Sequence, residues 1–130
     1  KRKPSIDEIK AMKLAWSVCA ITKSNAIIVS KEDAILGIGG GCVSRIDATN
    51  MAIEKVKKFA DKDNLGTKRN TLVLASDGFL PFADSVSSAV ELGITTIIEP
   101  GGSIRDDEVI AACDQAGVSL IFTGKRHFRH

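Results

Sequence analysis

The chain has 130 residues, of which 44% are hydrophobic, and this length suffices for one domain with a buried core. No apolar run approaches the roughly 18 residues that cross a bilayer, so we expect no membrane segment. Its three cysteines, Cys19, Cys42 and Cys113, are odd in number and far apart in the sequence. This argues against a disulfide framework and predicts a cytoplasmic protein.

The formal net charge is only +2, and the basic residues gather at the two ends of the chain. Six of the 18 Lys and Arg residues lie there, which leaves 12 against 16 acidic residues in the body. A nucleic-acid-binding protein is expected to carry a broad basic stripe, with aromatic platforms if it binds single strands. The sequence has no Tyr and one Trp, so nucleic-acid binding is disfavoured.

The first predicted element is a helix that opens at a capping box. Ser5 and, three residues later, Glu8 have the spacing of that motif, and the helix runs to about Ala20. Trp16 lies in its apolar pattern and is predicted to be a core residue rather than a platform for a cofactor. The other positions predicted to face inward are Ile9, Met12, Leu14 and Cys19.

A β-hairpin is predicted next, from the strands 25–30 and 34–39 with a short polar turn between them. A second helix follows from about Asp47 to Asp61. The polar stretch 61–70 is predicted to be a mobile linker.

The second half of the sequence alternates strands with helices. The predicted strand 71–76 has a continuous apolar run at 72–75, as expected for a strand that is covered on both faces. Ser103 is a candidate N-cap for the last helix, and Gly117 ends it. The remaining predicted elements are a helix from near Asp84 to Gly93, a strand 94–99, a helix 104–116 and a strand 118–123.

This order predicts an α/β fold with a mostly parallel mixed sheet and right-handed crossovers. Ligands of such sheets bind at the carboxyl ends of the strands. Four segments follow predicted strand ends and should converge there: GIGGGCVSR, SDGFLPFAD, EPGGS and TGKRHFRH.

Each of these loops has a structural and a functional interpretation. GIGGGC lacks the last glycine of the dinucleotide fingerprint and follows a hairpin strand, so a tight turn is the alternative. PGGS either offers free N–H groups to an anion or only caps a helix. FLPF is either a stacking wall or core. The terminal KRHFRH is a frayed tail, a metal site or the wall of an anion pocket; with no H-x-E or P-C-x-x-C motif, zinc is disfavoured.

Several motifs, in this order, resemble the last quarter of the bifunctional purine biosynthesis family, whose members join an IMP cyclohydrolase to an AICAR transformylase. They include KRKPSIDEIKAMKLAW, TKSNAIIVS, GIGGGCVSRID, ASDGFLPFADSV, EPGGSIRDDEVI and FTGKRHFRH, and they cover essentially the whole chain. The chain starts at Lys1 and not at Met, so we expect a piece from the middle of a longer chain, and the resemblance implies its C-terminal part. The resemblance implies a three-layer αβα subdomain like cytidine deaminase, without zinc.

The implied reaction moves a formyl group from 10-formyltetrahydrofolate to the exocyclic amine of AICAR, giving FAICAR, in a homodimer. The resemblance assigns Asn25 to the reacting groups and Asp77 to a structural potassium ion. Residues implied to bind AICAR are Phe79, Arg126 and Phe128. Residues implied to bind the folate are Arg45, Ile46, Pro81, Asp84, Ser85 and Ser103.

The sequence departs from the family at Gly40, Gly41 and Cys42, where GAGQ is usual, and at Gly78, where Ala is frequent. The lysine–histidine pair that the family uses for proton transfer is absent, since no histidine precedes His127, so the fragment alone is expected to be inactive. The alternative function is a non-catalytic nucleotide-binding module of deaminase-like fold.

Overall fold

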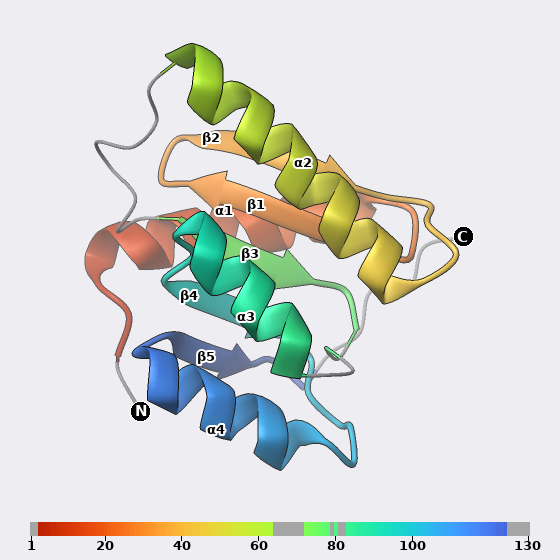
Figure 1. Cartoon of the computed structure of the whole chain (residues 1–130), viewed down its shortest axis with the longest axis vertical. Helices are drawn as coiled ribbons and strands as arrows, with labels where there is room; N and C mark the ends of the chain where they lie inside the picture. Colours follow the sequence, from red (N-terminus) through yellow and green to blue (C-terminus); the bar gives the residue numbers. More distant parts are fainter. Residues whose placement is uncertain (1–2, 64–71, 79, 81–82, 125–130) are drawn as a thin grey trace.

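One mixed sheet of five strands, with helices on both faces, organises the computed structural model (Figure 1). The model describes residues 3–63, 72–78, 80 and 83–124; the side chains of residues 59–63 and 83–85 lie outside that description. The strand order is β2-β1-β3-β4-β5. In chain order the elements are α1 (Ile6–Ile21), β1 (Ile27–Lys31), β2 (Ala34–Gly39), α2 (Arg45–Asp63), β3 (Val73–Ser76), α3 (Ala83–Leu92), β4 (Thr96–Glu99), α4 (Asp106–Ala116) and β5 (Ser119–Phe122).

Strand direction follows the prediction of a mostly parallel mixed sheet. β1 pairs antiparallel with β2 and with β3, whereas β3, β4 and β5 pair in parallel. Among the five described strands, β1 therefore runs against the other four. The predicted hairpin of β1 and β2 is confirmed.

Helix α1 covers one face of the sheet, behind the strands in Figure 1. The capping box is formed: the Ser5 N–H donates to Glu8 Oε1 at 2.8 Å, and the Glu8 N–H donates to Ser5 Oγ at 3.2 Å. Trp16 is half-buried and packs against the cluster under α1, which confirms its packing role. Ile9 was predicted to face inward, and this is wrong: it is exposed. The buried members of the cluster are Ala11, Met12, Ala15, Cys19, Ala26, Ile28, Val73, Ala75 and Ile98.

Helices α2, α3 and α4 cover the opposite face, so the fold has three layers, as predicted. The two clusters take alternate residues of the same strands, such as Ile27 and Ile28, because successive strand side chains point to opposite faces. Each fully buried aliphatic side chain contributes roughly 1.5–3 kcal/mol. This explains why β1 and β3 are apolar at successive positions.

Two glycines of β2 let α2 lie unusually close to the sheet. A Cβ at Gly37 would collide with the carbonyl oxygen of Ala52, and one at Gly39 with that of Ala48. Gly41 then turns the chain with φ of +65°. The glycine run is thus explained by close backbone packing and a tight turn, which was the structural interpretation of GIGGGC.

Several predicted boundaries are corrected by the structure. The second helix begins at Arg45, two residues before Asp47, because the Ser44 hydroxyl accepts a hydrogen bond from the Asp47 N–H at 3.0 Å. It continues to Asp63, so the predicted linker begins too early; residues 64–70 lie outside the described part. Ser103 does not cap α4: the N-cap position is Arg105, which makes no side-chain cap.

A buried carboxylate joins α1 to the start of β4. Glu8 is 1% exposed, and its Oε2 accepts a hydrogen bond from the Thr96 hydroxyl at 2.6 Å. Because Thr96 is the first residue of β4, this contact lies at the amino end of that strand. Glu8 therefore closes the capping box and also anchors α1 to the sheet.

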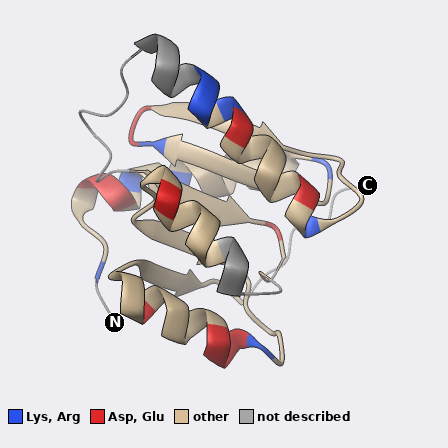
Figure 2. Ribbon diagram, viewed as in Figure 1, with Lys and Arg blue, Asp and Glu red and all other residues tan. Residues whose placement is uncertain are grey.

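Charged residues of both signs share the surface of the described part (Figure 2). Glu54 precedes Lys55, Lys57 and Lys58 on α2, and three acidic residues open α4. The face shown in Figure 2 therefore gives no support to a basic stripe. Within the described residues, no helix is both long and apolar enough to cross a membrane.

Candidate functional site

The strands bring the predicted site loops to one edge of the sheet. β2 ends at Gly39, β3 at Ser76 and β4 at Glu99, and Ile27 at the start of β1 pairs with both Gly39 and Ser76. Because β1 runs the other way, the segment before it reaches the same edge as the segments after β2, β3 and β4. The expected convergence of these loops is confirmed for the residues that the structure describes.

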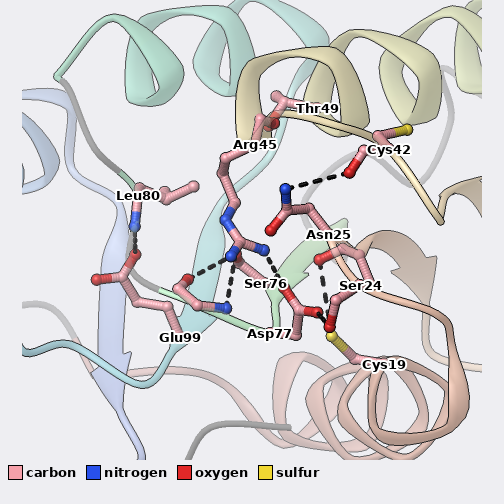
Figure 3. A network of polar contacts seen from close by, with 12 residues as sticks. Cys19, Ser24, Asn25, Cys42, Arg45, Thr49, Ser76, Asp77, Leu80 and Glu99 are labelled. Atoms are coloured by element: carbon pink, nitrogen blue, oxygen red, sulfur yellow. Dashed lines mark hydrogen bonds and ion pairs between the residues drawn. The ribbon is translucent and has the colours of Figure 1, made fainter. Parts of the chain in front are cut away.

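Asn25 is held rigidly at this edge. Its side-chain nitrogen donates to the carbonyl oxygens of Cys42 at 3.2 Å and Val43 at 3.1 Å (Figure 3). Its backbone N–H donates to the Cys42 carbonyl as well, at 3.2 Å. An amide nitrogen has two hydrogens, so these contacts use its donor capacity and leave the side-chain oxygen as an acceptor.

Asp77 is the centre of a buried polar network. Its side chain is 0% exposed; Oδ1 forms an ion pair with Nη1 of Arg45, and Oδ2 accepts a hydrogen bond from the Ser24 hydroxyl at 2.7 Å (Figure 3). The Asp77 N–H donates to the Ala26 carbonyl at 3.2 Å. The network links the start of α2, the end of β3 and the segment that carries Asn25.

These contacts bear on the potassium ion that the resemblance implies. Potassium needs several oxygen ligands, but both oxygens of Asp77 already contact donors, and the guanidinium of Arg45 balances its charge. They give no support to an ion at Asp77, which stays a prediction. In the described ranges, no group of three or more His, Cys, Asp or Glu residues is placed to hold a metal ion.

Glu99, which no sequence motif indicated, is the second buried carboxylate at this edge. It is 0% exposed, and its Oε2 accepts a hydrogen bond from the Leu80 N–H at 2.9 Å. Burial raises the pKa of Glu99 to about 7; the Leu80 N–H opposes this shift and the nearby charge of Asp106 adds to it. A charged residue that ends an apolar strand, as in TTIIE, is the sequence signal that would have found it.

The N–H groups of the loop after β4 are bound by a carboxylate at the start of α4. Asp106 accepts hydrogen bonds from the Gly102 N–H at 2.8 Å and the Ser103 N–H at 3.1 Å. The Ser103 hydroxyl accepts one from the Arg105 N–H at 3.0 Å. The anion-binding interpretation of PGGS is therefore disfavoured, because Asp106 already occupies these donors.

The other predicted site residues are distributed as follows. Ile46 lies in the first turn of α2 and is 47% exposed, beside Arg45 in sequence. Asp84 and Ser85 lie in the first turn of α3, and their side chains are not described. The predictions for Phe79, Pro81, Arg126 and Phe128 fall outside the described residues.

A solved structure with a similar fold supports the deaminase-like architecture. The dCMP deaminase of the cyanophage S-TIM5, in apo form, superposes with a TM-score of 0.56 at 18% identity and covers 94% of this chain and 100% of that chain. At this identity the likeness concerns the fold alone. The predicted cytidine-deaminase-like αβα fold is confirmed.

Sequence comparisons identify the relatives. Residues 1–55 match the model of the AICARFT/IMPCHase bienzyme family. The bifunctional purine biosynthesis proteins PurH of Elusimicrobium minutum, Roseobacter denitrificans and Aquifex aeolicus are 48%, 49% and 47% identical to the whole chain. The chain spans only about a quarter of the length of these relatives, 24–25%. The resemblance that the sequence motifs indicated is thus confirmed: over all 130 residues the chain is similar to part of the bifunctional purine biosynthesis proteins, and its first 55 residues match the AICARFT/IMPCHase bienzyme family.

Proposed function

We propose that this chain is the C-terminal subdomain of an AICAR transformylase and supplies part of the site that transfers a formyl group from 10-formyltetrahydrofolate to AICAR. IMP cyclohydrolase activity would belong to another part of the full-length protein. The observation that carries the proposal is the 47–49% identity over the whole chain to relatives named for purine biosynthesis. The cytoplasm is the proposed compartment, consistent with the three free cysteines.

Asn25 is the residue proposed to contact the reacting amine. That amine is a weak nucleophile, because its lone pair is delocalised into the ring, so the site must orient it against the formyl carbon. The side-chain nitrogen of Asn25 already donates to Cys42 and Val43. The remaining oxygen is therefore suited to accept an N–H of the amine, and this favours amine orientation over donation to the tetrahedral oxyanion.

Arg45 has two proposed roles in this arrangement. Its Nη1 pairs with Asp77, and a guanidinium has five N–H donors, so others remain for a folate carboxylate or carbonyl. On the same side we propose Ile46, Pro81, Asp84, Ser85 and Ser103 for the folate. For AICAR we propose Phe79, Arg126 and Phe128, with Arg126 on the phosphate.

Proton transfer and assembly depend on residues beyond this chain. Asn25 cannot take up the proton that the amine loses, so a base must come from elsewhere in the full-length protein. A homodimer is the proposed assembly. Because the base and the rest of the site lie outside it, the 130-residue chain alone is expected to bind substrates weakly and to transfer no formyl group.

The test is formyl transfer by the full-length protein that contains this chain, assayed with AICAR and 10-formyltetrahydrofolate. Asn25→Leu removes the acceptor while keeping the size, and we expect kcat to fall by about 100-fold, the usual scale for loss of an orienting group. Lys31→Ala, on the surface at the far end of β1, is the control and should leave kcat unchanged. If the wild-type protein binds AICAR but makes no FAICAR, the alternative of a non-catalytic nucleotide-binding module is correct.

A further inference from the structure

Glu99 makes a contact that neither the motifs nor the proposed reaction explains. It ends β4, and its Oε2 accepts the hydrogen bond of the Leu80 N–H at 2.9 Å (Figure 3). Leu80 is 1% exposed and belongs to the core cluster under α2, α3 and α4. The bond therefore joins the segment after β3 to the end of the neighbouring strand, from within the protein.

A buried carboxyl group at the end of β4 lowers the stability of the folded state unless its contacts compensate for the loss of water. Burying an ionisable group without full compensation disfavours the folded state. Arg45, whose positive charge acts on Glu99, is paired with Asp77. Oε1 of Glu99 has no hydrogen-bond partner among the described residues. The Leu80 bond is thus the specific contact that this carboxyl group makes within the described part.

The two halves of the segment after β3 have separate anchors. In the first half, Ser76 Oγ donates to the Gly78 carbonyl at 2.7 Å, and Asp77 holds Arg45 and Ser24. In the second half, the backbone of Leu80 is held by Glu99. Removing the Glu99 oxygen therefore releases the backbone at Leu80, while the Asp77 network stays in place.

We propose that Glu99 is a positioning residue, whose Oε2 fixes the backbone at Leu80 and thereby the path of the chain from β3 toward α3. For catalysis this inference rests on the proposed function, since Phe79 and Pro81, the sequence neighbours of Leu80, are there assigned to AICAR and to the folate. Glu99 itself acts through Leu80 and is not assigned a contact with either substrate.

The variants are Glu99→Leu, Glu99→Asp and Glu99→Gln, made in the full-length protein. Leu removes the acceptor. Asp keeps the carboxyl group, but its side chain is one methylene shorter, so the oxygen no longer reaches the Leu80 N–H. Gln keeps an acceptor oxygen at the same reach. Glu8→Leu is the matched control. Glu8 is also a buried, hydrogen-bonded carboxylate, but its partner Thr96 is at the opposite, amino end of β4.

The first readout is hydrogen exchange of the peptide that contains Leu80, which needs no activity. Exchange should accelerate about tenfold in Glu99→Leu and Glu99→Asp, the factor expected for one lost hydrogen bond, and stay near wild type in Glu99→Gln. Glu8→Leu should lower Tm without accelerating exchange there. The second readout is kinetic: KM for both substrates should rise about tenfold in Glu99→Leu and Glu99→Asp, with a smaller change in kcat.

The outcomes separate this inference from the proposed function. Unchanged exchange at Leu80 in Glu99→Asp, or equal effects of Gln and Leu, would overturn the positioning role. If Glu99→Leu fails to fold, Glu99→Asp against Glu99→Gln decides the question. A wild-type protein without formyl transfer would refute the proposed function, while the exchange measurement would still test the Glu99–Leu80 contact.

Discussion

Replacing Asp77 with Asn should destabilise the chain by about 3 kcal/mol. Asp77 is 0% exposed and Arg45 is 12% exposed at the side chain, so the pair is buried. Removing one partner of a buried ion pair leaves the other charge uncompensated, which costs roughly 3–5 kcal/mol. Asn keeps the size and one acceptor oxygen, so we expect the lower end of that range.

The assay is urea denaturation of the 130-residue chain, followed by the fluorescence of Trp16, its single tryptophan, and by circular dichroism. Asp33→Asn is the matched control: Asp33 pairs with Lys31 at 3.2 Å, but its side chain is 72% exposed. Such a surface pair is worth at most about 1 kcal/mol.

A double-mutant cycle with Arg45→Met isolates the interaction. We expect a coupling energy of about 2 kcal/mol or more between Arg45 and Asp77. A coupling below about 0.5 kcal/mol, or an Asp77→Asn effect no larger than that of Asp33→Asn, would refute a central role for this ion pair.

Three further predictions concern the site. Arg126→Ala in the full-length protein should weaken AICAR binding by about 1–3 kcal/mol, as for a lost bond to a charged group, and calorimetry should show folate affinity unchanged. Asp84→Asn should raise KM for 10-formyltetrahydrofolate and hardly change KM for AICAR, because one acceptor becomes a donor; equal changes in both would indicate misfolding instead. Burial raises the pKa of Glu99 from 4.5 to about 7, so the folded chain keeps a proton that the unfolded chain releases. The free energy of unfolding should therefore fall as pH rises from 4.5 to about 7, and denaturation of Glu99→Gln should lack that part of the slope.

Local patterns predicted most of the fold. The Ser5–Glu8 capping box and the hairpin depend on residues close in sequence, so their signals survive without tertiary information. The boundary at Ser103 could not be predicted in this way. The Asp106 carboxylate accepts hydrogen bonds from the Gly102 and Ser103 N–H groups, which holds this segment in a turn, and α4 therefore begins only at Asp106.

Strand ends predicted the loops that carry Arg45 and Asp77, whereas Asn25 was indicated only by the family resemblance. Asn25, Arg45 and Asp77 are 52 residues apart at most in sequence, and strand direction brings them together. Glu99 was missed because its contact is to a backbone N–H, which no side-chain motif marks; its only sequence signal is a charged residue at the end of the apolar strand TTIIE. Its pKa also depends on residues outside its strand: Leu80, Asp106 of α4 and Arg45 of α2.

The glycines of β2 have a consequence for how this protein can vary. At Gly37 and Gly39 the strand lies against the backbone of α2, at Ala52 and Ala48. Where side chains pack against each other, a substitution can be accommodated by a change of rotamer. The contact of these glycines with the α2 backbone has no such freedom. A methyl group at either glycine would collide with α2 and displace that helix, and Arg45 is the first residue of α2. Substitutions at these two positions should therefore disturb the candidate site from a distance, whereas the exposed Ile46 should tolerate changes.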